Sequence, residues 1–411
     1  MAVMKKIYFD YAATTPLDKS ARRAMEPYFS TVFGNPVSAH THGKDAREAV
    51  ERSRIEIATG IGVRAHEIIF TAGVTEANNM ALFGSVPPPS YGKISRPPHV
   101  VVSAIEHSSI LQAGRYLQEM GAHLTVVGVS RGGLVDPDEI CRALTSETAV
   151  VSVMYVNNEV GTIQRIRALS EAISRWKRVI GRGKNDYPYF HTDAAQAPRV
   201  LPFHPHSLGA DLLSIDGSKI YGPKGVGFLY VREGIVIRPL IVGAAQEGLR
   251  RAGTHNVTAI VGLAAALRRA EIFRKKEAKQ LTLLKNVFLR DLVKCIPDIT
   301  VNGSVKESVP SIINFSIPGI SGEALVAALN ARGCEISRGS ACLAPGDDTS
   351  YVVAALGGSP NLARESVRVS FGRETKKADV ASLVGVIGEV TALFRKKRVF
   401  DSGKRKKRVI V

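Results

Sequence analysis

Short apolar segments alternate with helix-like segments from about residue 60 to residue 240, and this alternation constrains the fold more than any other feature. Strands that are almost entirely apolar and alternate with helices are typical of a mostly parallel sheet covered on both faces. The alternation therefore predicts an α/β fold with a seven-stranded, mostly parallel sheet. The predicted strands lie in EIIFTAG, HVVVSAIEH, AHLTVVGV, AVVSVMYVNNEVG, YPYFHTDAAQA, ADLLSIDGSK and GVGFLYV.

A second, smaller domain is expected because 411 residues are too many for one compact core. Apolar and basic residues recur at helical spacing over 257–294, which predicts one long helix, or two, connecting the domains. The remainder contains the strand-like segments SIINFSI and SVRVSFG together with further helical segments, as in an α+β domain. The predicted division is a large domain of residues 15–256, a small domain of 1–14 and 257–394, and a tail of 395–411.

Composition argues against several classes of protein. Hydrophobic residues make up 45% and charged residues 22%, as is usual for a globular protein. No apolar run reaches the length of a membrane-spanning helix, and the first residues lack a signal-peptide pattern, so we expect a cytoplasmic protein that does not bind membranes. Four scattered cysteines without a CxxC pair predict neither a disulfide framework nor a metal site.

The C-terminal tail is strongly basic. The chain carries a net charge of +18, and the last 17 residues, RKKRVFDSGKRKKRVIV, hold nine Lys or Arg and one Asp, which is +8 of that total. Such runs are usually solvated and disordered, and this is the interpretation we favour. The alternative is an electrostatic arm that binds RNA, an acidic protein or an anionic surface.

Polar residues follow the predicted strands, where an open parallel sheet binds its ligands. FTAGVTEANN predicts a helix N-terminus that either binds phosphate or forms an ordinary turn capped by Thr75. Asp193 ends another strand and could bind a metal, act as an acid or base, pair with a heterocyclic cation or cap a helix. Lys219 ends an apolar strand, whereas Lys224 lies in the following turn. A lysine, a strand-end Asp and a phosphate-binding turn are together what pyridoxal phosphate requires.

Ten segments resemble those of the cysteine desulfurases, fold-type I pyridoxal phosphate enzymes, in order and approximate spacing over residues 6–395. This resemblance implies conversion of L-cysteine to L-alanine, with a persulfide on the enzyme. The sulfur would pass to an acceptor for iron–sulfur cluster assembly or tRNA thiolation. The segments are YFDYAATTP, FGNPVSAHTHG, FTAGVTEANN, IEHSSI, VNNEVGTIQ, HTDAAQ, SKIYGPKGVG, RRAGT, SRGSAC and SVRVSFG.

The resemblance also implies a role for each matching residue. Lys219 matches the Schiff-base lysine, and Cys342 matches the cysteine whose thiolate attacks the substrate sulfur. His107 would stack on the cofactor ring and move protons at the substrate amine. Thr254 would reach the cofactor phosphate from the partner subunit, which implies a homodimer. Further cofactor contacts are implied for Asp193, Gln196, Val74, Thr75, Ser218 and Asn158, and substrate contacts for Asn158, Arg368 and Asn35.

The segment before Lys219 departs from the family pattern. The family usually has Ser-Gly-His-Lys, whereas this chain has Asp216 and Ser218 at the two phosphate-binding positions. Ser218 can still donate a hydrogen bond. Asp216 places an anion where a dianionic phosphate is expected. We therefore expect either weaker retention of the cofactor or an Asp216 side chain turned onto a backbone N–H or Arg251.

Two other functions remain open from the sequence. A relative acting on selenocysteine or cysteine sulfinate would share most of these residues but would not need Cys342. A nucleic-acid-binding protein on this enzyme scaffold would use the basic tail instead. Cys334 matches no family role; we expect a buried structural thiol, with a regulatory disulfide to Cys342 as the alternative.

Overall fold

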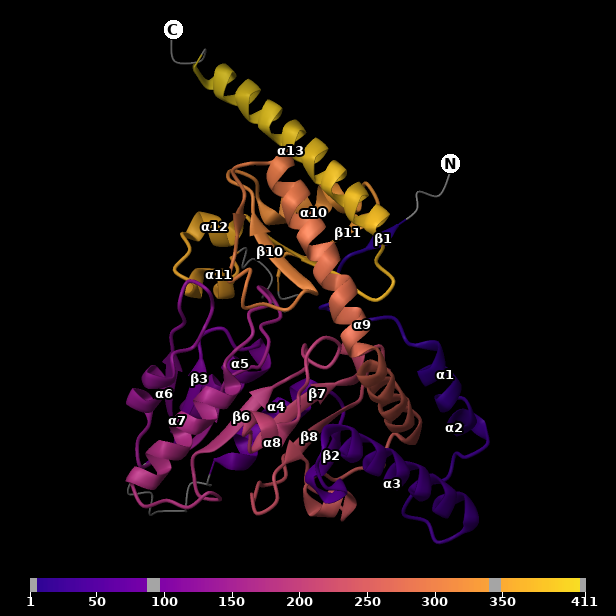
Figure 1. Ribbon diagram of the computed structural model, residues 1–411. Coiled ribbons are helices and arrows are strands. Elements are labelled where there is room, and N and C mark those ends of the chain that lie inside the picture. The colour runs from indigo at the N-terminus through magenta and orange to yellow at the C-terminus, as the bar shows by residue number, and fades with distance from the viewer. Residues whose placement is uncertain (1–5, 87–96, 340–348, 407–411) are drawn as a thin grey trace. The chain divides into compact units, whose positions relative to one another are not determined.

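The computed structural model describes residues 6–86, 97–339 and 349–406, with side chains described as far as residue 396. The chain divides into two units. The larger unit comprises Thr14–Asn157 and Thr162–Lys276. The smaller unit comprises Met1–Ala13, Asn158–Gly161 and Glu277–Val411. Figure 1 shows the elements of each unit along the chain.

The larger unit contains the seven-stranded sheet that the alternating pattern predicts, in the order β2-β8-β7-β6-β5-β3-β4. Strands β3 to β7 pair in parallel, whereas β8 runs antiparallel to both of its neighbours, β2 and β7. The mostly parallel α/β fold is thus confirmed. The strands are β2 (Ile68–Thr71), β3 (His99–Ser103), β4 (His123–Val127), β5 (Thr148–Ser152), β6 (Tyr189–Asp193), β7 (Leu212–Asp216) and β8 (Gly227–Val231).

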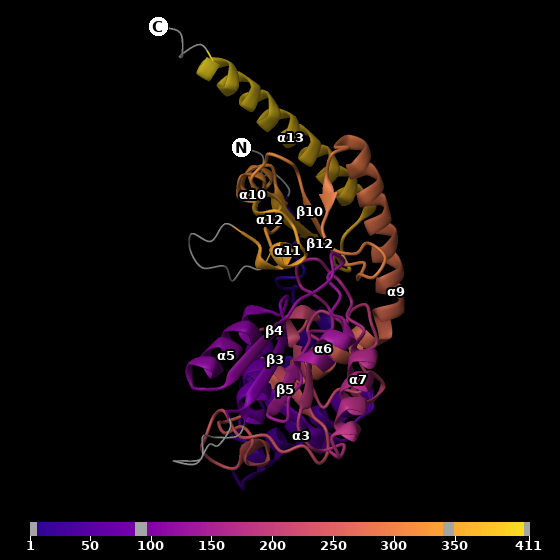
Figure 2. The same ribbon diagram turned by 90° about the vertical axis from the view of Figure 1, so that its left-hand side faces the viewer.

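Two pairs of helices cover the sheet. Helices α4 (Val74–Ser85) and α5 (Ser108–Glu119) pack against each other, and α6 (Pro137–Ala143) and α7 (Ile166–Val179) form the second pair. Figure 2 shows α5 on one side of the strands and α6 and α7 on the other. Because both faces are covered, β2, β3, β5, β6 and β8 are buried along their whole length. The remaining helices of this unit are α1 (Lys19–Met25), α2 (Pro27–Ser30), α3 (Thr41–Ile61) and α8 (Pro205–Leu208).

The smaller unit is an α+β structure. Its antiparallel sheet has the order β12-β10-β9, and β1 pairs in parallel with β11. The predicted connector is one continuous helix, α9 (Val257–Cys295), which begins in the larger unit and ends in the smaller one. The other elements are β1 (Ile7–Tyr8), β9 (Thr300–Val301), β10 (Ile312–Ser316), β11 (Cys334–Glu335), β12 (Ser366–Ser370), α10 (Gly322–Asn330), α11 (Tyr351–Ala355), α12 (Pro360–Arg364) and α13 (Lys377–Lys406).

The basic tail differs from the expectation of disorder. Helix α13 continues to Lys406 and so takes in most of residues 395–411. Lys and Arg are good helix formers, and a helix already present can extend into such a run one hydrogen bond at a time. Within the described part of the chain, no helix combines the length and apolar character needed to cross a membrane.

Candidate active site

The carboxyl ends of neighbouring strands position the candidate residues of the larger unit. Strand β6 ends at Asp193, and β7 ends at Asp216, after which the 3-10 turn η2 (Gly217–Lys219) carries Lys219. Strand β2 leads into the N-terminus of α4, and β3 leads to His107, the residue that caps α5. The candidate cofactor residues predicted for this unit on strand ends therefore belong to one edge of one sheet.

Asp193 is a buried carboxylate held in a fixed orientation. Its Oδ2 accepts a hydrogen bond from Asn78 Nδ2 at 2.7 Å, and its Oδ1 accepts one from the backbone N–H of Ala195 at 2.9 Å. Burial raises the pKa of Asp193, whereas both hydrogen bonds and the nearby His107 act in the opposite direction. A carboxylate fixed in this way can pair with a cationic ring nitrogen.

A chain of hydrogen bonds joins Asp193 to His107. Asn78 Nδ2 also donates to Ser109 Oγ at 3.0 Å, and Ser109 Oγ lies 2.9 Å from His107 Nδ1. His107 Nδ1 also accepts from the backbone N–H of Ser109 at 3.2 Å. The proton of the neutral imidazole therefore lies on Nε2, which can donate to a ligand.

Sequence reasoning missed Asn78 and Ser109. The one available signal was Asn78 itself, a polar residue among the mostly apolar residues of the buried face of α4. Its Oδ1 is buried without a hydrogen-bond partner among the described residues, as expected for a group that faces a bound molecule.

The backbone around Lys219 is held on both sides by Thr15. The Thr15 backbone N–H and hydroxyl both donate to the carbonyl of Ser218, at 2.9 and 2.8 Å. Thr15 Oγ1 in turn accepts the backbone N–H of Tyr221 at 2.7 Å, and Tyr221 has a φ of 62°. Lys219 is half-buried, whereas Lys224 in the following turn is exposed. The hydrogen bonds of Thr15 therefore hold the backbone on both sides of Lys219, whereas Lys224 lies beyond them.

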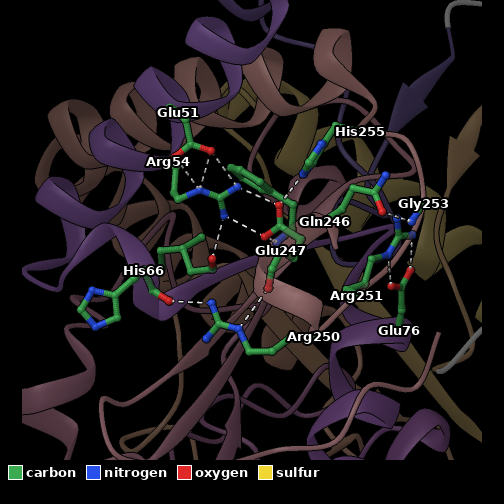
Figure 3. A network of polar contacts seen from close by, with 12 residues as sticks. Glu51, Arg54, His66, Glu76, Gln246, Glu247, Arg250, Arg251, Gly253 and His255 are labelled. Carbon is green, nitrogen blue, oxygen red and sulfur yellow. Dashed lines mark hydrogen bonds and ion pairs between the residues drawn. The ribbon is translucent and has the colours of Figure 1, made fainter. Parts of the chain in front are cut away.

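Asp216 accepts hydrogen bonds at the N-terminus of α4. Its Oδ2 accepts from the backbone N–H of Val74 at 3.0 Å. Its Oδ1 accepts from the backbone N–H and the hydroxyl of Ser218, at 2.7 and 2.5 Å. Of the two orientations expected, Asp216 therefore adopts the one toward backbone N–H groups. Arg251 pairs instead with Glu76, as Figure 3 shows.

Arg368 and Asn158 are adjacent in the smaller unit. Arg368 is 2% exposed, and its guanidinium donates to the carbonyl of Asn158 at 2.8 Å and to Asp10 Oδ1 at 2.7 Å. Among the residues that the structure describes, Arg368 Nε and Asn158 Oδ1 are buried without hydrogen-bond partners. A pinned guanidinium with an unused donor suits recognition of a carboxylate.

The other predicted residues are less constrained. Gln196 is half-buried after β6. Thr75, Asn35 and Thr254 are exposed, at the start of α4 and on two loops. Cys342 lies outside the described residues. Cys334 is buried, and burial raises the pKa of its thiol, as expected for a structural cysteine.

An ion-pair network fixes the loop that carries Thr254 (Figure 3). Both carboxylate oxygens of Glu247 accept from Arg54 at 2.7 Å, and Oε2 also accepts the backbone N–H of Phe70 at 3.0 Å. His255 Nε2 lies 2.6 Å from Glu247 Oε1. Glu247 thus ties the loop to α3 and to β2.

These residues fit pyridoxal phosphate on its ring side. The groups that the ring and its aldehyde require are a buried carboxylate, an adjacent amide oxygen without a hydrogen-bond partner among the described residues, and a half-buried lysine just after the next strand. The phosphate side has backbone donors at the α4 N-terminus, but Asp216 already engages one of them.

Comparison with known proteins agrees with this chemistry. Residues 7–383 match the model of the class-V aminotransferase family. A cysteine desulfurase IscS of Dictyoglomus turgidum is 39% identical over 391 residues, which cover 95% of this chain and 96% of that protein.

Solved structures give the same result. A NifS-like protein is 30% identical with a TM-score of 0.85 and covers 94% of this chain and 100% of its own. SspA, solved in complex with cysteine, is also 30% identical, with a TM-score of 0.75 over 89% of this chain and 99% of its own. The chain therefore belongs to the cysteine desulfurases, pyridoxal phosphate-dependent enzymes of the class-V aminotransferase family.

Proposed function

We propose that this cysteine desulfurase uses Lys219, His107 and Cys342 to convert L-cysteine to L-alanine and a persulfide on Cys342. The hydrogen-bonded series Asp193–Asn78–Ser109–His107 is the observation that best supports this assignment. It joins the end of β6 to helices α4 and α5, and Lys219 follows β7, the strand next to β6. It provides an anion for the ring nitrogen and an imidazole of known tautomer in the same part of the larger unit.

The residues divide the proton transfers between them. Bound pyridoxal phosphate supplies a cationic ring that withdraws electrons from the substrate Cα. Asp193 holds the proton at the ring nitrogen, and Gln196 donates to the ring hydroxyl. Lys219, once its amine is free, takes the Cα proton, and His107 Nε2 exchanges a proton with the substrate amine.

Sulfur transfer then requires a thiolate at Cys342. The thiolate attacks the substrate sulfur, a sulfur–sulfur bond forms, and the carbon–sulfur bond breaks. The electron pair of the broken bond stays with the substrate carbon, which is protonated to give the methyl group of alanine. The sulfur is oxidised to the persulfide level as that carbon is reduced, so no external oxidant is needed.

The smaller unit supplies the proposed carboxylate recognition. Arg368 is held by Asp10 and by the Asn158 carbonyl, so its planar guanidinium is preorganised. We assign the substrate carboxylate to Arg368 and Asn158, with Asn35 as a further polar contact. SspA, solved with cysteine, supports this substrate class.

A second copy of the chain is the partner that we propose for the larger unit. Eight apolar side chains of this unit are exposed by more than 60%, and five of them lie in two short segments, 29–37 and 242–249. In a homodimer these five would be covered, and Thr254 would be offered to the phosphate of the other subunit. These side chains are Phe29, Phe33, Val37, Val242 and Leu249.

Three features of cellular context complete the proposal. The sulfur acceptor is a protein of iron–sulfur cluster assembly or tRNA thiolation, by analogy with the relative named IscS. For the basic C-terminal residues, 395–411, binding of RNA or an acidic partner is the alternative to a solvated tail without a partner. The described cysteines Cys141, Cys295 and Cys334 are free thiols, which supports residence in a reducing compartment such as the cytoplasm.

One incubation tests the activity and the residue assignment together. Purified protein incubated with pyridoxal phosphate and L-cysteine should release alanine. The peptide that contains Cys342 should gain about 32 Da, the mass of one sulfur atom. Lys219→Ala should abolish alanine release, and Cys342→Ser should abolish the mass gain. Cys334→Ser is the matched control and should retain both. A persulfide on any other cysteine, or alanine release by Lys219→Ala, would refute the assignment.

A further inference from the structure

We propose that Asp216 acts as a built-in anion in the phosphate pocket, so that this enzyme distinguishes only weakly between pyridoxal phosphate and pyridoxal. The inference rests on the proposed function, because it concerns how that cofactor is held. It makes Asp216 a specificity-determining residue.

The Asp216 carboxylate engages the donors that a phosphate would need. Three donors converge on it, namely the backbone N–H of Val74, the backbone N–H of Ser218 and the Ser218 hydroxyl, at 2.5–3.0 Å. Val74 is the first residue of α4, so its N–H lies at the positive end of a helix of 12 residues. Negative charge at this helix end is therefore already provided by the protein itself.

A second carboxylate lies in the same pocket. Ala72, Gly73, Thr75, Glu76, Asn79, Asp216 and Leu240 line a cavity of about 480 Å³ at the start of α4. Glu76 Oε2 accepts the backbone N–H of Ala72 at 2.8 Å, and Glu76 also pairs with Arg251 at 2.7 Å (Figure 3). The positive charge of Arg251 is thus matched by Glu76. Asp216 thus adds a further negative charge where a dianion should bind.

The backbone leaves Asp216 little freedom to withdraw. Gly73 has a φ of 144°, and a side chain there would approach Asp216 Oδ2 to 3.2 Å. Gly227 on β8 is more tightly enclosed, because a Cβ there would lie 2.3 Å from the carbonyl oxygen of Ile215 and 3.0 Å from the Gly73 backbone. The turn before α4 and strands β7 and β8 are therefore in tight contact. Asp216 can move away only by rotating its side chain, with loss of all three hydrogen bonds.

Binding a phosphate here must therefore displace Asp216 or place like charges within a few ångströms. Either alternative lowers the affinity for the phosphate by about tenfold or more, as Coulomb repulsion at an intermediate dielectric constant predicts. The ring contacts through Asp193 and Lys219 do not involve these donors. Pyridoxal, which has the ring and the aldehyde but no phosphate, escapes the penalty.

The test compares two ligands across variants of the full-length protein. Dissociation constants of pyridoxal phosphate and pyridoxal are measured by absorbance titration for wild type, Asp216→Asn and Asp216→Ser. Both variants should bind pyridoxal phosphate at least about tenfold more tightly, with pyridoxal changed less than about threefold. Glu171→Gln on α7 removes one exposed negative charge elsewhere and should change neither constant. Two substitutions are used in case one of them fails to fold.

Several results would overturn the proposal. One is a dissociation constant of pyridoxal phosphate that stays unchanged or rises in both variants. Another is an equal decrease in the dissociation constants of the two ligands. Inorganic phosphate provides a probe that needs no cofactor chemistry, since it should raise the melting temperature of Asp216→Ser more than that of wild type. An equal shift in both proteins would refute the role of Asp216 even if the proposed function holds. Conversely, if neither ligand gives a Lys219-dependent absorbance change, the proposed function fails, and the phosphate comparison still decides on Asp216.

Discussion

Replacement of Glu247 by Gln should destabilise the larger unit strongly, because it removes the charge that Arg54 and His255 share. Glu247 is 7% exposed, and four hydrogen-bond donors reach its carboxylate. Gln has the same shape, but its amide nitrogen would face the donors of Arg54. The change therefore leaves a buried guanidinium without its counter-charge.

The magnitude follows from the pKa of Glu247. Burial by itself raises this pKa, but the hydrogen bonds from Arg54 and His255 and the charge of Arg54 outweigh burial and lower it from 4.5 to about 2. A depression of that size corresponds to about 3 kcal/mol of stability at neutral pH. This agrees with the cost of breaking a buried ion pair, about 3–5 kcal/mol.

The sign of the pH dependence is fixed by the direction of the shift. Because the folded state holds the lower pKa, the contribution is fully present above pH 4.5 and is lost as the pH falls toward 2. About 2 kcal/mol of it should be gone at pH 3. The difference between wild type and Glu247→Gln should therefore shrink on acidification.

Urea denaturation provides the assay. The single tryptophan, Trp176, lies on α7 in the larger unit, so its fluorescence reports on the unit that contains Glu247. Glu51→Gln is the matched control, since Glu51 also contacts Arg54 but its side chain is 53% exposed. It should cost no more than about 1 kcal/mol. Equal losses in the two variants, or a Glu247→Gln deficit that persists unchanged at pH 3, would refute the reasoning.

Three further predictions concern the active-site residues and Cys334. Asn78→Leu removes a donor from Asp193 and a partner from Ser109, so the dissociation constant of the cofactor, measured by absorbance titration, should rise about tenfold; an unchanged constant contradicts the role of Asn78. Arg368→Lys cannot satisfy both Asp10 and the Asn158 carbonyl, so steady-state kinetics should show KM for L-cysteine raised by about tenfold or more; a change confined to kcat would argue against carboxylate binding. Cys334→Ala removes a buried thiol and should cost about 1 kcal/mol in urea denaturation, with persulfide formation on Cys342 retained; loss of that persulfide would indicate a functional Cys334.

Much of the fold could be predicted from the sequence, because burial on both faces of a sheet leaves a local signature. Strands β3, β5 and β8 are mostly apolar runs, as expected of segments buried on both sides, and helical spacing identified α9. The same logic separated the two lysines of IDGSKIYGPKG, since only Lys219 directly follows a buried strand. No sequence pattern indicated that β8 runs antiparallel to its neighbours, because a strand buried on both faces is equally apolar in parallel and antiparallel pairs.

The candidate site was only partly accessible in the same way. A departure from the family pattern marked Asp216, but its choice of Val74 and Ser218 over Arg251 depends on a turn 142 residues away in sequence. The link from Asp193 through Asn78 and Ser109 to His107 spans three different elements, and no spacing along the chain encodes it.

The Glu247 network shows the same limit most clearly, since Arg54 and Glu247 are 193 residues apart in sequence. The sequence by itself determined which segments bury their side chains and where strands end, because these follow from local patterns of polarity. Only the tertiary structure decided which donor meets which carboxylate, because a hydrogen bond depends on tenths of an ångström between groups that the fold brings together.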